Sequence, residues 1–215
     1  MKLQDLEHLR SDRRIRFSNE IVNGQELTIV CYMVGDNELW QLPLATECRG
    51  IVFDANGDCV CRPFHKFFNV GENYFTQVST VSGMNLEALE KRDGSMLTPV
   101  LVGGKVFWKT KKSFNSEIAI EAANNVPQNV MTLAIWLLRQ NFTPIFEYTS
   151  PFNKVVLNYG ETPAFVLLAV RHNESGNYIA YDEMKELETA YGVEVIKKFD
   201  MTLQDCLNQV DTSLR

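Results

Sequence analysis

A lysine just before a tight turn is the arrangement in this 215-residue sequence with the clearest chemical potential. The segment Lys91-Arg92-Asp93-Gly94-Ser95 places one amine two residues before Asp-Gly. Asp-Gly is a turn dipeptide, so a surface turn is the simplest interpretation of the bare segment. A lysine amine is also a nucleophile when its surroundings favour the uncharged form. The surroundings therefore decide between a turn and a reactive site.

Basic residues flank this segment on both sides. Lys105, Lys109 and Lys111 occupy odd positions of a predicted downstream strand, so we expect them on one face. Arg49 and Lys66 lie in a predicted strand pair upstream. Cations neutralise the charge that builds on a transferring phosphoryl group, and they favour the neutral form of a nearby lysine. The pattern therefore predicts phosphate chemistry at the lysine motif.

Several motifs follow one another in the order found in ATP-dependent RNA ligases of the bacteriophage T4 type, the type 1 RNA ligase family. The chain resembles the N-terminal part of these enzymes over nearly its whole length. The matching stretches are Glu47-Cys48-Arg49-Gly50-Ile51, Arg62 to Asn69, Lys91 to Ser95, Lys109-Thr110-Lys111, Phe146-Glu147-Tyr148 with Pro151, Asn153 and Val155, and Leu167 to Arg171 with Tyr178 to Asp182. DNA ligases and mRNA capping enzymes share the Lys-x-Asp-Gly nucleophile and form a related alternative. The Glu47 to Gly50 and Lys66 to Asn69 stretches favour the RNA ligase.

The resemblance implies a covalent nucleotidyltransferase that uses ATP with Mg²⁺ or Mn²⁺. Lys91 would attack the α-phosphate of ATP, release pyrophosphate and hold AMP on its side-chain nitrogen. AMP would then pass to the 5′-phosphate of an RNA end. A 3′-hydroxyl would attack this activated end, seal the strand and release AMP. RNA with 5′-phosphate and 3′-hydroxyl ends is therefore the expected partner, in RNA or tRNA repair.

The resemblance also implies roles for individual residues. The expected catalytic residues are Lys91, Glu147 and Lys111. Glu147 would hold a ribose hydroxyl or assist the metal indirectly. Phe68 would shape the nucleotide site, and Gly94 would let the backbone approach the ligand. The residues expected to bind nucleotide or phosphate are Arg49, Lys66, Phe68, Asp93, Gly94 and Lys109.

Each of these residues has a structural interpretation as well. Arg49 and Glu147 can form a cross-strand ion pair, which is worth less than about 1 kcal/mol at a surface. Phe67 and Phe68 are consecutive on a predicted strand, so one of them is expected to face the core. The lysines downstream of the motif can lie on a solvated strand face.

Two elements of the family pattern are missing after Arg171. One is Glu-Gly before an apolar strand, which supplies a metal-binding carboxylate. The other is Lys-x-Lys on a strand, which contacts the α-phosphate, and Lys197-Lys198 is adjacent and too early to replace it. We therefore expect a single, incomplete adenylyltransferase domain over residues 1–215, without the C-terminal strands and the tRNA-recognising helical domain.

Three interpretations of function stay open. The chain is a compact or truncated RNA ligase, or the N-terminal half of a split one whose second polypeptide supplies the missing strands. It is a degenerate relative that binds a nucleotide or an RNA end without sealing. Or it is a protein-interaction module on the ligase fold. The matched lysines support the first two, and the acidic net charge of −6 gives slight support to the third.

The composition is that of an ordinary globular protein. Hydrophobic residues make up 45% of the chain and charged residues 22%, which excludes a disordered chain. Five cysteines without a secretion signal favour buried, reduced thiols rather than a disulfide framework or a zinc site. The N-terminus has no apolar stretch for a signal peptide, and no apolar run is long enough to span a bilayer. We expect a cytoplasmic protein, in the host cytoplasm if it is viral, with no membrane partner.

Turn signals and periodicity predict the elements that position these residues. Asn56-Gly57 and Gly103-Gly104 predict hairpin turns. Leucines three residues apart at positions 3, 6 and 9 predict an N-terminal helix. The predicted strands are Glu26 to Val34, Arg49 to Asp54, Cys59 to Pro63, Ser95 to Val102, Lys105 to Thr110, Thr143 to Tyr148, Val155 to Tyr159, Phe165 to Arg171 and Val193 to Lys197.

A helical insert separates these strands into two groups. Ser113 to Gln140 predicts two helices with a break near Pro127. Further helices are predicted at Asp182 to Tyr191 and Thr202 to Val210, and Asn85 to Lys91 fits a strand or a helix. The pattern predicts an α+β fold built on antiparallel sheets. The resemblance implies the nucleotidyltransferase domain of the covalent ligase superfamily, with the sheets around a nucleotide cleft and Lys91 beside Arg49, Lys66, Lys111 and Glu147.

Overall fold

The computed structural model describes residues 1–152 and 162–213 and divides them between two compact units. The first unit consists of Met1–Lys66 and Asp93–Val195, and the second of Phe67–Arg92 and Ile196–Arg215. Among the described residues, no helix has the length and apolar character needed to cross a membrane. The single domain over residues 1–215 stays a prediction.

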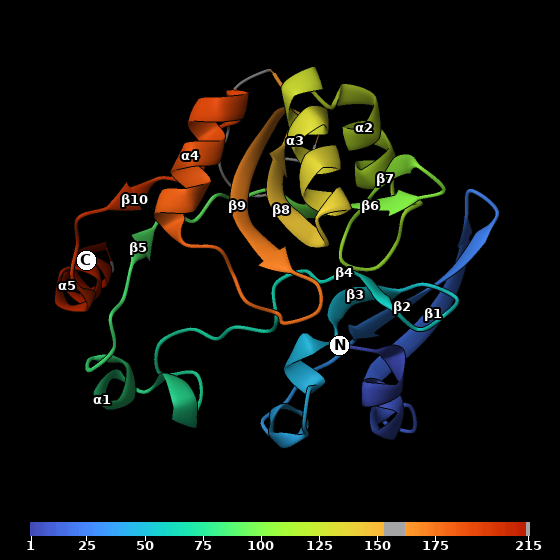
Figure 1. The fold of residues 1–215 in the computed structure, drawn as a ribbon. Helices are drawn as coiled ribbons and strands as arrows, with labels where there is room; N and C mark the ends of the chain where they lie inside the picture. The colour runs from blue at the N-terminus through green and yellow to red at the C-terminus, as the bar shows by residue number, and fades with distance from the viewer. Residues whose placement is uncertain (153–161, 214–215) are drawn as a thin grey trace. The chain divides into compact units, whose positions relative to one another are not determined.

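The first unit contains a four-stranded antiparallel sheet in the order β1-β2-β3-β4 (Figure 1). Its strands are β1 (Ile15–Val22), β2 (Gln25–Tyr32), β3 (Arg49–Phe53) and β4 (Cys59–Cys61). The hairpin predicted at Asn56-Gly57 joins β3 to β4 as expected. Strand β1 was not predicted, although Asn23-Gly24 carries the same turn signal: both residues have positive φ, 49° and 74°, as a two-residue hairpin turn requires.

Three 3₁₀ helices cover one face of this sheet. They are η1 (Leu3–Leu9), η2 (Leu39–Gln41) and η3 (Ala45–Glu47). The predicted N-terminal helix is thus confirmed, and its leucine spacing of three matches the three residues per turn of a 3₁₀ helix. The buried cluster on this face includes Leu6, Leu9, Val30, Leu39, Ile51 and Phe53.

The other face packs on a second antiparallel sheet in the order β7-β6-β8-β9. Its strands are β6 (Ser95–Val102), β7 (Lys105–Lys109), β8 (Phe142–Thr149) and β9 (Ala164–His172). The hairpin predicted at Gly103-Gly104 joins β6 to β7. The core between the two sheets consists of Val22, Leu27, Ile29, Val52, Cys61, Val100, Val102 and Phe114.

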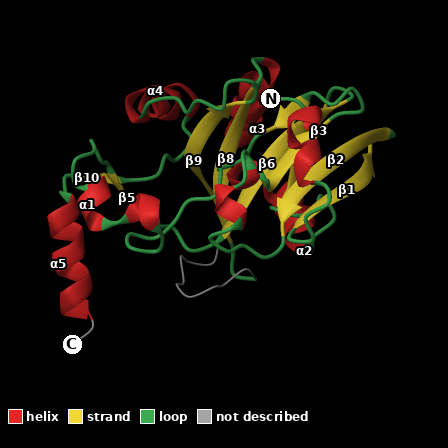
Figure 2. Cartoon of the chain, turned by 90° about the horizontal axis from the view of Figure 1, so that it is seen from below, coloured by secondary structure: helices red, strands yellow, loops and turns green. Residues whose placement is uncertain are grey.

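Helices α2 (Glu117–Asn125), α3 (Gln128–Arg139) and α4 (Tyr181–Tyr191) lie outside the second sheet (Figure 2). The break predicted in the helical insert is confirmed, because Pro127 has extended backbone and stands directly before α3. Buried leucines, valine and alanine of α3 pack toward the sheet, and a further helix was correctly predicted at α4. Helices outside antiparallel sheets confirm the α+β class.

The second unit is small and contains short elements. They are η4 (Tyr74–Thr76), α1 (Val78–Val81), β5 (Ala88–Leu89), β10 (Lys198–Phe199) and α5 (Leu203–Ser213). Strands β5 and β10 pair antiparallel, which resolves the ambiguous segment before the lysine motif as a strand. Helix α5 confirms the predicted C-terminal helix.

One predicted strand is wrong, and another lies outside the described residues. The strand predicted at Val193 to Lys197 is wrong, because Val195 makes only an isolated parallel bridge with Leu167 of β9. Its apolar side chains are buried by packing rather than by a ladder, which periodicity alone does not distinguish. The strand predicted at Val155 to Tyr159 lies outside the described residues, as do the motif residues Asn153 and Val155.

A bulge at Gly50 decides the direction of Arg49. Val30 of β2 pairs with Ile51, whereas the next residue, Cys31, pairs with Arg49, so β3 carries one extra residue. That residue is Gly50, whose φ of 91° lies in the region that favours glycine. Without the bulge, Arg49 would share the face of Ile51, beneath the 3₁₀ helices. The extra residue turns Arg49 to the face of Cys31, toward the second sheet.

A second constraint acts on the same glycine. A Cβ at Gly50 would lie closer to the carbonyl oxygen of Lys111 than real Cβ atoms approach any atom. The bulge and the connection that follows β7 are therefore in direct contact, and only glycine satisfies both the backbone angle and the space.

We expect Gly50→Ala to destabilise the protein by about 2–5 kcal/mol, since about 1–2 kcal/mol of left-handed strain adds to about 1–3 kcal/mol of overpacking. Gly24→Ala is the matched control, because Gly24 has a φ of 74° with nothing within 4 Å of its added Cβ. The control is expected to lose only the strain, about 1–2 kcal/mol. Urea unfolding of the three proteins measures both losses, and equal losses would contradict the close contact at Gly50.

Candidate active site

The Asp-Gly part of the lysine motif is fixed against Glu147. Gly94 stands directly before β6, and its backbone N–H donates a hydrogen bond of 2.9 Å to Oε1 of Glu147. Met96 of β6 pairs with Glu147 of β8 in the sheet. A Cβ at Gly94 would collide with the carbonyl oxygen of Tyr148. Gly94 therefore permits a close approach within the protein, so that the motif and the predicted catalytic carboxylate are in contact.

Arg49 reaches the same strand pair from the first sheet. Its Nη1 lies 3.8 Å from Sδ of Met96, the residue opposite Glu147. The bulge at Gly50 makes this possible, since it turns Arg49 toward the second sheet. The bulge thus brings Arg49 to the strand pair that carries Glu147, a second residue of the predicted site.

Lys109 is completely buried, with 0% of its surface exposed. Its Nζ donates a hydrogen bond of 2.9 Å to the carbonyl oxygen of Gly50. Burial lowers the pKa of Lys109 below its ordinary value. The alternative of a solvated strand face is therefore wrong for this lysine, which ties β7 to the bulge beside Arg49. Its predicted contact with phosphate stays a prediction.

The prediction that Lys105, Lys109 and Lys111 lie on one face of a strand is also wrong. Strand β7 ends at Lys109, so Lys111 lies beyond the strand and outside its alternation. Lys105, at the other end of β7, is exposed. Alternation assigns residues to a face, but the packing of the second sheet on the first covers part of that face and leaves the rest to solvent.

Two lysines of the predicted site share an aromatic pair. Nζ of Lys111 lies 3.5 Å from the ring centroid of Tyr32, and Nζ of Lys66 lies 5.9 Å from that of Trp40. The two rings meet edge to face, 4.9 Å apart. The backbone N–H of Lys66 also donates to the carbonyl oxygen of Thr46 at 2.7 Å. Cation–π contact positions both ammonium groups on one aromatic surface that the sequence did not identify.

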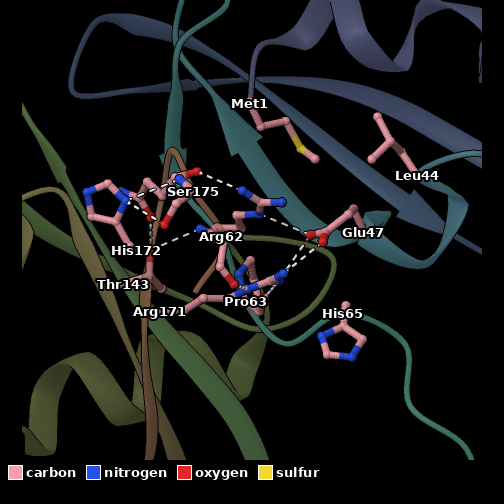
Figure 3. A network of polar contacts seen from close by, with 12 residues as sticks. Met1, Leu44, Glu47, Arg62, Pro63, His65, Thr143, Arg171, His172 and Ser175 are labelled. Carbon is pink, nitrogen blue, oxygen red and sulfur yellow. Dashed lines mark hydrogen bonds and ion pairs between the residues drawn. The ribbon is translucent and has the colours of Figure 1, made fainter. Parts of the chain in front are cut away.

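A buried carboxylate joins two arginines in the network of Figure 3. Oε2 of Glu47 accepts from Nε of Arg62 at 3.1 Å and from Nη1 of Arg171 at 3.0 Å, and Oε1 accepts from Nη2 of Arg171 at 2.7 Å. Burial opposes ionisation of Glu47, but the hydrogen bonds and charges of the two arginines outweigh it. The pKa of the Glu47 carboxyl therefore lies below its ordinary value.

The same arginines hold the backbone that leads to Lys66. Nη1 of Arg171 donates to the carbonyl oxygen of Pro63 at 2.7 Å. The Arg171 guanidinium lies 4.9 Å from the ring centroid of Tyr178, whose hydroxyl contacts Nδ1 of His65 at 2.9 Å. The segment from Pro63 to Lys66 is thus held by side chains. No role was predicted for Glu47, Arg62, Arg171 or Tyr178, although all four lie in the motif stretches.

This segment corrects two sequence expectations. Strand β4 ends at Cys61, so Lys66 does not lie in a strand pair with Arg49. Phe67 and Phe68 follow it in a segment without regular structure and do not alternate on a strand. Side chains take the place of a ladder here: Arg171 donates to the carbonyl oxygen of Pro63, and Oγ1 of Thr143 accepts from the backbone N–H of Arg62.

Phe68 and Lys91 belong to the second unit. Their positions relative to Arg49, Lys111 and Glu147 stay predictions. The chain itself sets one limit: Lys91 precedes Gly94 by three residues, and three residues of extended chain span at most about 11 Å.

The thiols agree with the sequence expectation. Cys31, Cys48, Cys59 and Cys61 are buried and free, and Cys206 is partly exposed. Burial raises the pKa values of Cys48 and Cys59 to about 12. Among the described residues, no group of three or more His, Cys, Asp or Glu side chains is placed to hold a metal ion.

A sequence profile described as RNA ligase matches residues 47–214. The chain belongs to the RNA ligase family. It is 35% identical over 171 residues to a provisionally named RNA ligase of Thermovibrio ammonificans, covering 78% of this chain and 45% of that protein. It is 31% identical over 167 residues to RNA ligase 1 of bacteriophage TS2126, covering 73% and 42%. The chain therefore spans less than half the length of these relatives.

Solved RNA ligases share the fold. An archaeal ATP-dependent RNA ligase superposes with a TM-score of 0.59 at 14% identity, covering 85% of this chain and 47% of that one. A mutant of the Naegleria gruberi RNA ligase with ATP and Mn superposes with a TM-score of 0.54 at 14% identity, covering 93% and 68%. The expected nucleotidyltransferase fold of the covalent ligases is confirmed.

The buried carboxylate of this RNA ligase family member gives a pH prediction. Because the folded-state pKa of Glu47 lies below its unfolded value, the carboxylate contributes stability above about pH 4.3, which is lost as pH falls toward the folded-state pKa. Glu47→Gln is expected to cost about 3–5 kcal/mol near neutral pH, since it leaves two buried guanidinium groups short of a partner. The cost is expected to shrink in acid.

Glu7→Gln is the matched control for this measurement. Glu7 pairs with Arg10 at 2.6 Å on the surface, with more than half of its side chain exposed, and such pairs are worth less than about 1 kcal/mol. Urea unfolding between about pH 7 and pH 3 measures both variants. The same small effect for both carboxylates would show that the buried network contributes no more than a surface pair.

Proposed function

We propose that this chain carries out the adenylylation chemistry of an ATP-dependent RNA ligase, with Lys91 as the nucleophile. The observation that supports this most directly is the hydrogen bond from Gly94 to Glu147, which joins the Lys-x-Asp-Gly motif to the predicted catalytic carboxylate. The approach of Arg49 to the strand pair that carries Glu147 supports it further. Membership of the RNA ligase family supplies the reaction type.

The first step forms a bond between Nζ of Lys91 and the α-phosphorus of ATP. The bond from that phosphorus to the bridging oxygen of the β-phosphate breaks, pyrophosphate leaves, and the amine loses its proton to solvent. In the second step an oxygen of an RNA 5′-phosphate attacks the same phosphorus, the P–N bond breaks and Nζ recovers a proton. In the third step an RNA 3′-hydroxyl attacks the activated 5′-phosphate and AMP leaves.

The cations of the first unit provide the electrostatic environment for these steps. Negative charge grows on the α-phosphate and the leaving pyrophosphate, so preorganised positive groups stabilise the transition state. Arg49, Lys66 and Lys111 are the groups proposed for this role. The aromatic pair holds Lys66 and Lys111 in place, and Lys109 holds the bulge that aims Arg49. Phe68 is proposed to shape the nucleotide pocket.

The protein would supply only part of the ligands of a divalent ion at this site. The described residues offer no cage of three ligands, so Mg²⁺ or Mn²⁺ would be held largely by phosphate oxygens with one or two carboxylates. The carboxylates proposed to assist the ion are those of Glu147, which accepts from Gly94, and of Asp93, which directly precedes Gly94 in the chain. The ion would neutralise phosphate charge. The structurally similar mutant of the Naegleria gruberi RNA ligase was solved with ATP and Mn, which supports the choice of nucleotide and ion.

RNA with 5′-phosphate and 3′-hydroxyl ends is the proposed substrate, and repair of RNA in the cytoplasm is the proposed setting. A second polypeptide that completes the nucleotide pocket is also proposed. The Glu-Gly and Lys-x-Lys stretches that it would supply do not occur between Arg171 and Arg215.

The covalent intermediate is tested by label transfer from ATP. Incubated with α-labelled ATP and Mg²⁺ or Mn²⁺, the wild-type chain is expected to retain label on a denaturing gel, and Lys91→Ala is expected to retain none. Lys105→Ala is the matched control, since this lysine is exposed at the far end of β7 and lies outside the proposed site. An unlabelled wild-type chain that is folded would exclude adenylylation by this chain alone and demote it to a half-enzyme that needs the second polypeptide or to a nucleotide- or RNA-end-binding relative.

The charged groups of Lys111 and Glu147 are tested by the rate of label transfer. Lys111→Ala and Glu147→Gln are each expected to slow label transfer by about 10²–10³, the usual cost of losing one preorganised electrostatic group. Single-turnover labelling measures the rates, and thermal unfolding shows whether each variant is folded. Rates within about threefold of wild type would remove these two residues from the site.

A further inference from the structure

A polar groove of about 340 Å³ lies along β1 and β2, beside the connection between β7 and α2. Arg16 and Ser18 of β1, Cys31 of β2 and the following Met33, and Lys112 of the connection are among its lining residues. All of these residues belong to the first unit. None of them has a role in the chemistry proposed above.

The groove is continuous with Arg49 through the register of the first sheet. Arg16 of β1 pairs with Cys31 of β2, and Cys31 pairs with Arg49 of β3. Paired residues of an antiparallel sheet point to the same face, so the three side chains form one row across the strands. Two strand spacings separate the Cα atoms of Arg16 and Arg49 by about 10 Å. The row therefore runs from the proposed phosphate contact to the edge strand.

The row carries positive charge along its length. Burial raises the pKa of the Cys31 thiol, and the charges of Lys111, Lys109, Lys112 and Arg49 oppose that rise, so these cations all act on the middle of the row. Arg16 and Lys112 are exposed. Within residues 1–152 and 162–213, neither of them makes an ion pair, whereas the nearby Arg14 is held by Asp12 and Asp36.

The acidic residue of the groove is engaged with the protein. Oε2 of Glu20 accepts from the backbone N–H of Phe114 and from Nδ2 of Asn115, both at 3.4 Å. The remaining lining combines hydroxyl and amide groups with apolar atoms of Ile29 and Met33. Arg and Lys together with Ser and Asn side chains are the groups with which proteins contact the phosphates and sugars of nucleic acids.

We infer that this groove holds the phosphodiester backbone of an RNA strand that continues from the end-binding residues past Arg49 toward β1. The inference rests on the proposed function, because it identifies the ligand as the RNA substrate. A net charge of −6 disfavours general attraction to RNA, so binding depends on such a local positive row. Arg16 and Lys112 are its outer contacts, and they act on binding rather than on the reacting atoms.

The test is a comparison of RNA lengths. The probes are 5′-phosphorylated oligouridylates of about four and about twelve nucleotides with a fluorescent 3′ end, read by anisotropy. Arg16→Gln with Lys112→Gln is expected to weaken binding of the longer probe at least about tenfold and of the shorter probe less than about twofold. The slope of log K against log salt is expected to decrease in magnitude by about 1.4, or 0.7 for each lost phosphate contact.

Arg13→Gln with Lys105→Gln is the matched control. It removes the same charge from two exposed cations outside the groove, and it is expected to leave both probes at wild-type affinity. Equal weakening by the control pair would show that total charge governs binding, and it would overturn the groove. Thermal unfolding verifies that both double variants are folded.

Label transfer at graded ATP separates the two sources of phosphate. If the groove holds the RNA backbone, the groove variant needs no more ATP than wild type for half-maximal labelling. A raised ATP requirement with unchanged RNA affinity would assign the groove to the triphosphate of ATP and overturn the inference. If the wild-type chain takes no label while the groove variant still loses affinity for the longer probe, the proposed function fails and the groove stands.

Discussion

Buried charge that must be paired organises the first unit. Glu47 lies between Arg62 and Arg171 with 11% of its side chain exposed, where an unpaired carboxylate would be far too costly. Two guanidinium groups against one carboxylate leave an excess positive charge, and backbone carbonyl oxygens accept the remaining N–H groups. The cluster thereby joins η3, β9 and the segment after β4. Lys66 is positioned because this cluster holds the backbone before it.

Lys109 is a second buried polar group that needs a hydrogen-bond partner. Its side-chain nitrogen is enclosed between the sheets, and the carbonyl oxygen of Gly50 is the partner that accepts from it. A glycine bulge exposes that carbonyl and turns Arg49 toward the second sheet. Burial of one lysine and direction of one arginine are therefore parts of a single arrangement. Stability and site geometry are coupled here through backbone conformation rather than through the contacts of the reacting groups themselves.

The sequence predicted most of the sheets and helices because their signals are local. Asn-Gly and Gly-Gly turns lie between apolar runs, and Pro127 interrupts a helical pattern. The missed strand β1 also carried such a signal, in Asn23-Gly24. The wrong expectations concern burial: alternation places Lys105 and Lys109 on one face but does not show which part of it another sheet covers.

For the site as well, the residues in sequence motifs could be predicted, whereas the roles that depend on long-range contacts could not. Motif order identified Glu147, Gly94, Arg49 and the lysines, and the structure brings the first three to one strand pair. The roles of Glu47, Arg62 and Arg171 could not be assigned, because their contact joins segments up to 124 residues apart. The aromatic support of Lys66 and Lys111 was missed for the same reason, since Tyr32 and Trp40 acquire a function only through lysines distant in sequence.

The bulge in β3 has a consequence for how this chain tolerates length changes. Side chains alternate between the two faces of the sheet on each side of Gly50, but the register of the two sides differs by one residue. Deleting Gly50 would make Arg49 the direct neighbour of Ile51, and a regular ladder would then keep Arg49 opposite Cys31, on the face toward the second sheet. The orientation of the arginine would therefore survive this deletion, whereas the backbone at the bulge and its contacts would be lost. A single codon lost at this position would leave a buried lysine without the carbonyl oxygen that accepts from it, while Arg49 still faces the second sheet.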